Sequence, residues 1–186
     1  MTKPVVYLRA ECFFSIIFGA IDTGKKECLG ILFGREDNRS GNKLIVENVC
    51  EIQSITKRTS GKAWHSKASA DRIDKLLECA PAAFPFIGYF HSHTQWSSRE
   101  SHYPLLSEGD FEDLKTSGAK LEIIVDIGKA SGSCPWTLRQ NGAIVGRLAN
   151  WRVALHAYNI EGDTWQKLKL KVDPSVFLKL RRPTEK

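Results

Sequence analysis

Short apolar runs alternate with polar turns along most of the chain, and their periods predict both strands and helices. Strands are expected where apolar and β-branched residues run together or alternate with polar ones. These segments are residues 4–8, 27–34, 43–56, 86–90, 121–127, 135–139, 142–147, 152–160 and 164–172. Helices are expected over residues 10–21 and 66–79, where apolar residues recur every three or four positions. Two more are expected over residues 107–117, which Ser107 can cap, and 174–180, which Asp173-Pro174 can start.

The order of these elements predicts the α/β (α+β) class, with a mixed central β-sheet flanked by helices. The chain is expected to form a single domain over residues 1–186. Asn141-Gly142 is a favoured tight-turn pair, so the strands on either side of it should form a hairpin. A second hairpin, in a basic C-terminal region (about 150–186), should extend or cover the sheet. The polar and basic residues 56–66 predict a surface loop.

The net charge of the chain is +6, and the excess of lysine and arginine is uneven. It gathers at Lys57, Arg58 and Lys62 and again in residues 167–186. Such a balance can indicate binding to nucleic acid or to an acidic protein. Since the sequence has no nucleic-acid motif, a solvated basic surface is the favoured interpretation, and nucleic acid is not an expected partner.

The use of cysteine predicts a reducing compartment. The five cysteines are an odd number, and they form no C-x-x-C pair, so free thiols are expected. The N-terminus lacks an apolar core after a basic start, which argues against a signal peptide. The longest apolar stretch, residues 13–21, is too short to cross a bilayer. A cytoplasmic protein without a membrane segment is therefore expected.

Candidate metal ligands follow the apolar strand at residues 86–90. His91 and His93 are two positions apart, so in a continuing strand both imidazoles point to the same side. Ser107 is a good N-cap for the helix after it, and Asp110 falls in the first turn of that helix. Two histidines and one aspartate make a plausible three-ligand zinc set that leaves the fourth position open.

A further element lies upstream, where Glu27 opens an apolar run containing Gly30, Leu32 and Gly34. Together, E-x-x-G-x-L-x-G, H-S-H and S-x-x-D resemble the JAMM (MPN+, JAB/Mov34) metalloprotease family, over roughly residues 10–130. The chain departs from the family pattern at Thr94, where proline is usual. Its loop 94–106 is also longer than the usual one, which makes Glu100 or His102 alternatives to Asp110 as the third ligand.

The resemblance implies a single MPN/JAB-like domain and a Zn²⁺-dependent isopeptidase. Such a hydrolase would cut the bond between the C-terminus of a ubiquitin-like modifier and a target amine. His91, His93 and Asp110 would hold the zinc. Glu27 would act as general base, and Ser107 would donate to the oxyanion. The stand-alone format resembles prokaryotic members that act with E1- and E2-like enzymes, some of them in antiphage operons.

Two other classes of function are considered beside this one. A catalytically silent MPN scaffold would keep the fold and bind partner proteins, but the complete set of Glu27, His91, His93, Ser107 and Asp110 argues against it. A zinc deaminase would need H-x-E and P-C-x-x-C motifs, which the sequence lacks. The long loop 94–106 is interpreted either as a surface loop or as a lid beside the metal site.

Overall fold

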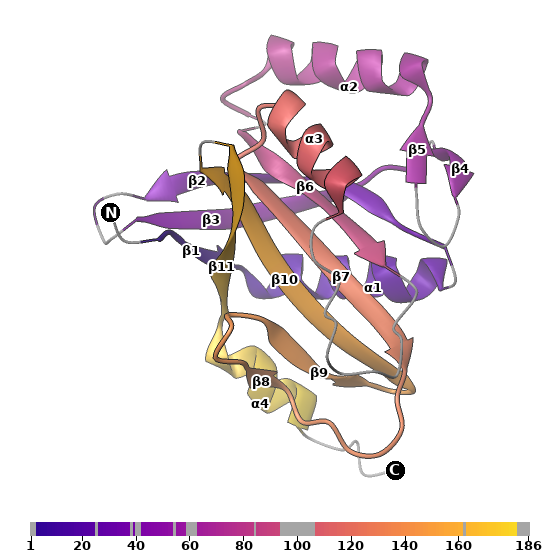
Figure 1. Ribbon diagram of the computed structural model, residues 1–186, viewed down its shortest axis with the longest axis vertical. Coiled ribbons are helices and arrows are strands. Elements are labelled where there is room, and N and C mark those ends of the chain that lie inside the picture. The colour runs from indigo at the N-terminus through magenta and orange to yellow at the C-terminus, as the bar shows by residue number, and fades with distance from the viewer. Residues whose placement is uncertain are drawn as a thin grey trace.

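The computed structural model describes residues 3–24, 26–37, 39, 42–53, 55–58, 63–83, 85–93, 107–161 and 163–181. Its main feature is a nine-stranded sheet in the order β11-β1-β3-β2-β6-β7-β10-β9-β8 (Figure 1). The strands of this sheet are β1 (Val5–Leu8), β2 (Leu29–Asp37), β3 (Lys43–Glu51), β6 (Phe86–His93), β7 (Leu121–Lys129), β8 (Thr137–Leu138), β9 (Ile144–Leu148), β10 (Trp151–Glu161) and β11 (Thr164–Val172).

Seven of these strands form a closed barrel, so the expected α/β (α+β) sheet flanked by helices, of MPN/JAB type, is wrong. The closing strand is β11. It forms an antiparallel hairpin with β10, in which Ala157 pairs with Leu168, and it also pairs in parallel with β1, where Val5 meets Lys169. The final hairpin therefore neither extends nor covers an open sheet; it joins the two edges. Strands β9 and β8 continue the sheet beyond β10.

Four helices accompany the strands in the described part of the chain: α1 (Ala10–Thr23), α2 (Lys67–Cys79), α3 (Glu108–Thr116) and α4 (Pro174–Arg181). All four were predicted from the sequence. Side-chain caps fix two of the starts: Ser66 accepts from the Ser69 amide in front of α2, and Ser107 caps α3. None of these helices has the length and apolarity that crossing a bilayer requires.

One local prediction is wrong. Residues 56–66 were expected to form a surface loop, but β4 (Ile55–Arg58) and β5 (Ala63–His65) pair there as a small antiparallel sheet. The hairpin was not predicted because neither strand alternates apolar with polar residues, which is the pattern that indicates a strand. The stretch predicted as residues 43–56 is correspondingly divided between β3 and β4.

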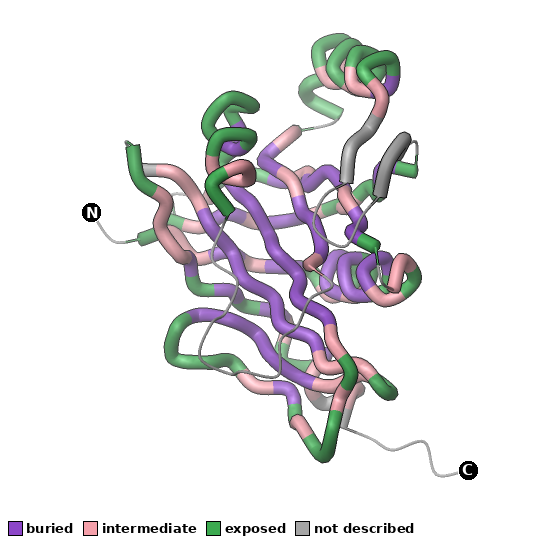
Figure 2. Tube along the Cα trace, turned by 45° about the vertical axis from the view of Figure 1, so that its right-hand side comes forward, coloured by how far each residue is buried: buried purple, intermediate pink, exposed green. Residues whose placement is uncertain are grey.

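The main core draws on every strand of the barrel and on α1, as the buried central strands in Figure 2 show. Side chains alternate across a strand, so β7 turns Ile123 and Val125 to this core and Glu122, Ile124 and Asp126 to the opposite face. That opposite face lies beneath α3, whose Leu114 packs with Ile124 in a second cluster. The polar groups of the candidate site therefore lie on the α3 side of the barrel wall.

Strands β6 and β7 approach each other closely where they carry this site. A methyl group at Gly88 of β6 would collide with the backbone carbonyl of Leu121. Glycine therefore permits the parallel register in which His91 stands opposite Ile124 and His93 opposite Asp126.

Candidate metal centre

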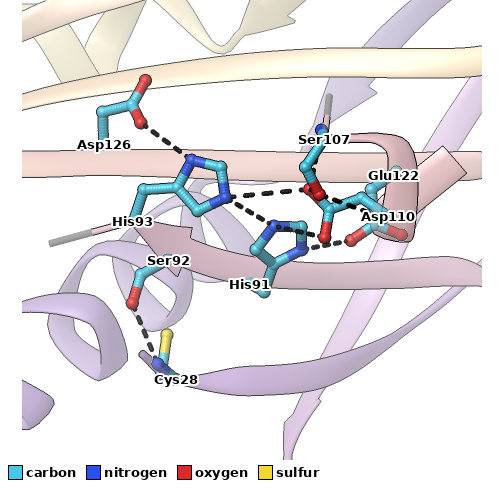
Figure 3. Close-up of polar contacts among 8 residues, drawn as sticks. All are labelled: Cys28, His91, Ser92, His93, Ser107, Asp110, Glu122 and Asp126. Atoms are coloured by element: carbon cyan, nitrogen blue, oxygen red, sulfur yellow. Dashed lines mark hydrogen bonds and ion pairs between the residues drawn. The ribbon is translucent and has the colours of Figure 1, made fainter. Parts of the chain in front are cut away.

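His91 and His93 lie at the C-terminal end of β6, and both rings point toward the start of α3 (Figure 3). Their Nε2 atoms lie 3.0 Å apart. The Asp110 carboxylate completes the group, with Oδ1 3.6 Å from His91 Nε2 and Oδ2 3.9 Å from His93 Nε2. Ligand atoms of all three residues lie within 4.8 Å of one another, so the group can hold a metal ion.

The outer nitrogens of the two rings face carboxylates from β7. His91 Nδ1 lies 2.7 Å from Glu122 Oε1, a short charge-assisted hydrogen bond, and His93 Nδ1 lies 3.5 Å from Asp126 Oδ1 (Figure 3). Glu122 and Asp126 are both buried. In a metal-bound form both Nδ1 atoms would carry hydrogen toward these carboxylates, which would leave each Nε2 free to act as a ligand.

This arrangement fits a metal ion. Two imidazole lone pairs facing each other at 3.0 Å repel unless a proton or a cation lies between them. Two nitrogens bound to one tetrahedral zinc ion stand about 3.3 Å apart, close to the distance observed. Two neutral imidazoles and one carboxylate are also a donor set that zinc accepts.

The raised pKa of His91 also shows that its surroundings favour positive charge. Burial alone lowers the pKa of this ring, but the hydrogen bond and charge of Glu122, with the charges of Asp110 and Glu27, raise it to about 9. A proton held here in the metal-free protein occupies the position that a cation would take.

Asp110 is fixed by the N-terminus of α3. Ser107 and Asp110 form a capping box, in which Ser107 Oγ accepts from the Asp110 amide at 3.1 Å and the Ser107 amide donates to Asp110 Oδ2 at 2.9 Å. The Ser107 hydroxyl itself donates to Oδ2 at 2.6 Å. Burial tends to raise the pKa of Asp110, but His91 and these hydrogen bonds together lower it, so the carboxylate stays ionised. The structure thus assigns Ser107 a positioning contact to Asp110.

Glu27 lies beside this group although it is distant in the sequence. Its neighbour Cys28 contacts Ser92, which is 64 positions further along the chain. The Cys28 amide donates to Ser92 Oγ and the Ser92 amide donates to the Cys28 carbonyl, so the chain before β2 continues along the end of β6. Because Leu29 pairs with His91, Glu27 falls opposite His93 on the same face of the sheet. Its side chain is 4% exposed, and its charge acts on the His91 ring.

The structure brings His91, His93 and Asp110 together as a group that could hold a metal ion, as predicted. Ser107 contacts Asp110, and the charge of Glu27 acts on His91, but their catalytic roles stay predictions. Ser92 points away from the group, toward Cys28 (Figure 3). Glu100, His102 and the rest of the loop 94–106 lie outside the described residues.

The sequence analysis missed Glu122, Asp126 and His156, which surround the histidines. His156, on β10, is fully buried, and its Nε2 lies 3.2 Å from Asp126 Oδ2. A signal was present in the sequence: Glu122 and Asp126 interrupt an otherwise apolar run in residues 121–127, and His156 interrupts another in residues 153–158. Charged residues inside a buried strand require partners, and such partners are commonly part of a site.

Comparison with known proteins gives the fold but no activity. No protein-family profile matches the chain, and no curated protein matches it. Among solved structures, the chain is similar to the solution structure of protein DSY2949 from Desulfitobacterium hafniense, with a TM-score of 0.54 and 14% identity, over 91% of this chain and 93% of that one. At this identity the similarity concerns the fold alone.

Proposed function

We propose that this protein is a zinc-dependent hydrolase of amide bonds, and that its substrate bond joins the C-terminus of a ubiquitin-like modifier to a target amine. The observation that carries the proposal is the pair of His91 and His93 Nε2 atoms, 3.0 Å apart, with the Asp110 carboxylate beside them. The proposal rests on this site and not on the fold. The choice of substrate rests on the resemblance of the motifs to those of JAMM metalloproteases.

In this proposal His91, His93 and Asp110 hold the zinc. When bound, the ion would polarise the scissile carbonyl and acidify a water molecule. The chain itself supplies the proton transfer. Hydrolysis forms a bond between the water oxygen and the carbonyl carbon and breaks the C–N bond, so a proton must move from the water to the leaving nitrogen. In this proposal Glu27 accepts that proton and then delivers it; Glu27 is buried, and its charge acts on the His91 ring.

Ser107 has two roles in this proposal. Its hydroxyl donates to Asp110 Oδ2 in the structure, which holds the third ligand in place. To donate to an oxyanion, as the resemblance implies, the hydroxyl would have to turn away from Asp110 during the reaction. We propose the positioning contact as its resting role and the oxyanion contact as its role during turnover.

The proposed setting is the cytoplasm, with the modifier conjugate as substrate and E1- and E2-like enzymes as partners. All five cysteines are free thiols, which suits a reducing compartment.

The first test is the zinc content of the wild type and of Asp110→Ala, measured by elemental analysis after dialysis. About one zinc per wild-type chain, strongly reduced in the variant, is expected, because a carboxylate ligand cannot be replaced by a methyl group. Asp113→Ala, in the same helix but outside the ligand group, is the matched control and should keep its zinc. A wild type without zinc after reconstitution, or an unchanged zinc content in Asp110→Ala, would contradict the metal assignment.

The second test is hydrolysis. Zinc-loaded wild type should cleave a ubiquitin-like modifier from a lysine side chain, and Glu27→Gln should retain zinc while losing turnover, because glutamine cannot accept the proton. A loaded protein that cleaves none of a panel of modifier conjugates would contradict the proposed substrate while leaving the zinc site intact.

A further inference from the structure

Carboxylates of a single strand, β7, contact both histidines. Glu122 and Asp126 are four positions apart on β7, so both side chains point to the same face, beneath His91 and His93. In the parallel register of β6 and β7, His93 stands directly opposite Asp126. His91 stands opposite Ile124, and Glu122, two residues before Ile124, reaches it diagonally. Each ring thus meets its own carboxylate.

Asp126 has a second imidazole neighbour. Both of its oxygens are buried, so each requires a donor close by. One oxygen faces His93 Nδ1 at 3.5 Å, and the other faces His156 Nε2 at 3.2 Å. A buried carboxylate without donors is costly, so the contacts that hold Asp126 in its position come from these two rings.

His156 is placed by the neighbouring strand. β10 pairs with β7 so that Ala154 stands opposite Asp126 and His156 opposite Ile124, which puts the His156 ring one pair away on the same face. The ring is fully buried and stacks against Tyr158 at 6.5 Å between ring centroids. Burial and the contact with Tyr158 restrain the His156 ring, and the restrained ring can in turn hold Asp126.

We propose that Glu122 and Asp126 are positioning residues that orient the Nε2 atoms of His91 and His93 toward the metal, and that His156 holds Asp126 against His93. This inference rests on the metal-binding part of the proposed function, and it does not depend on the substrate. It assigns a role to three buried polar residues on two strands that supply no ligand. The successive contacts from His156 to Asp126 and from Asp126 to His93 connect β10, through β7, to the proposed ligand on β6.

The test is zinc affinity, measured by competition with a chromophoric chelator. Glu122→Leu removes the acceptor for His91 and should weaken zinc binding roughly 10- to 100-fold, the usual cost of losing such a partner. Glu122→Gln keeps an acceptor oxygen and should recover most of that loss. His156→Phe keeps a ring but cannot donate to Asp126, so zinc binding should weaken by about 10-fold. His156→Gln restores a donor and should bind more tightly than His156→Phe.

Val153→Ala is the control for a general loss of stability. Val153 is fully buried on β10 but points to the main core, away from the site. The variant should unfold more easily while binding zinc as the wild type does. If the leucine or phenylalanine variant fails to fold, the two glutamine variants still test the idea: the visible absorption spectrum of the cobalt-substituted protein should change in each, because ring orientation sets ligand geometry.

The outcomes separate the two proposals. If Glu122→Leu and His156→Phe bind zinc as tightly as the wild type, or if Val153→Ala weakens zinc binding as much as they do, the positioning role is wrong and the zinc site stands. A wild type that binds no zinc overturns the proposed function and this inference together. Weakened binding in both variants, rescued by glutamine and absent in the control, establishes the positioning role.

Discussion

Replacing Leu170 by alanine tests the closure of the barrel by β11. Leu170 is fully buried in the main core and stands opposite Val6 of β1. The change removes three carbons, each contributing about 0.8 kcal/mol when buried, which gives ~2.4 kcal/mol. The cavity left behind adds to this, so we expect the free energy of unfolding to fall by about 3 kcal/mol. If β11 were a loosely attached hairpin, the loss would stay below about 1 kcal/mol.

The assay is urea unfolding followed by tryptophan fluorescence, with chelator present so that metal binding does not add to the stability. Lys169→Ala, the neighbouring exposed position, is the matched control and should change stability by no more than about 0.5 kcal/mol. Val6→Ala and the double variant complete a cycle. Contact between β1 and β11 predicts a coupling of about 0.5 kcal/mol or more. Additive losses, or a Leu170→Ala variant as stable as the control, would refute the closed arrangement.

Three further outcomes are expected. Glu27→Gln should lower the hydrolysis rate by at least about 100-fold, the size of a general-base contribution, at unchanged zinc content, and an equal loss of zinc would instead make Glu27 a ligand. Ser107→Ala should cost about 1 kcal/mol of unfolding free energy through loss of the cap and should also weaken zinc binding through Asp110; Ser107→Thr, which keeps the hydroxyl, is the control. In maleimide labelling at neutral pH, exposed Cys50 should react quickly. Cys12 should react only after unfolding, because burial raises the pKa of its thiol to about 11; rapid labelling of both would contradict the packing of α1.

The ligand group was predictable because its signals are local. The two-residue spacing of His91 and His93 fixes a shared side within one strand, and the capping box of Ser107 and Asp110 is a pattern within one helical turn. Glu27 came from the resemblance of its motif, and the structure places it beside His91 through the pairing of β2 with β6. No periodicity in the sequence could have supplied that pairing.

The supporting residues were missed because their partners lie on other strands. Whether Asp126 meets a histidine depends on the register between β6 and β7, and whether it meets His156 depends on the register between β7 and β10. A charge in an apolar run shows that some partner exists, but it does not identify the partner. Identifying it requires the three-dimensional pairing.

The fold class was wrong for a similar reason. The alternation of Leu168, Leu170 and Val172 with lysines shows that one face of β11 is buried, and the structure bears this out. The same alternation suits an edge strand, a cover and a closing strand equally well. The decision depends on the parallel pairing of β11 with β1, a contact between opposite ends of the sequence that leaves no local trace.

That pairing has a consequence for how the chain is made. β1 is synthesised long before β11, so Val5 finds its partner Lys169 only after all the residues between them have been made. Until then the β1 edge facing β11 has no partner, and the main core lacks one of its walls. The long sequence separation predicts that this last pairing is slow to form. During that interval the unpaired edge of β1 would be open to pairing with other chains.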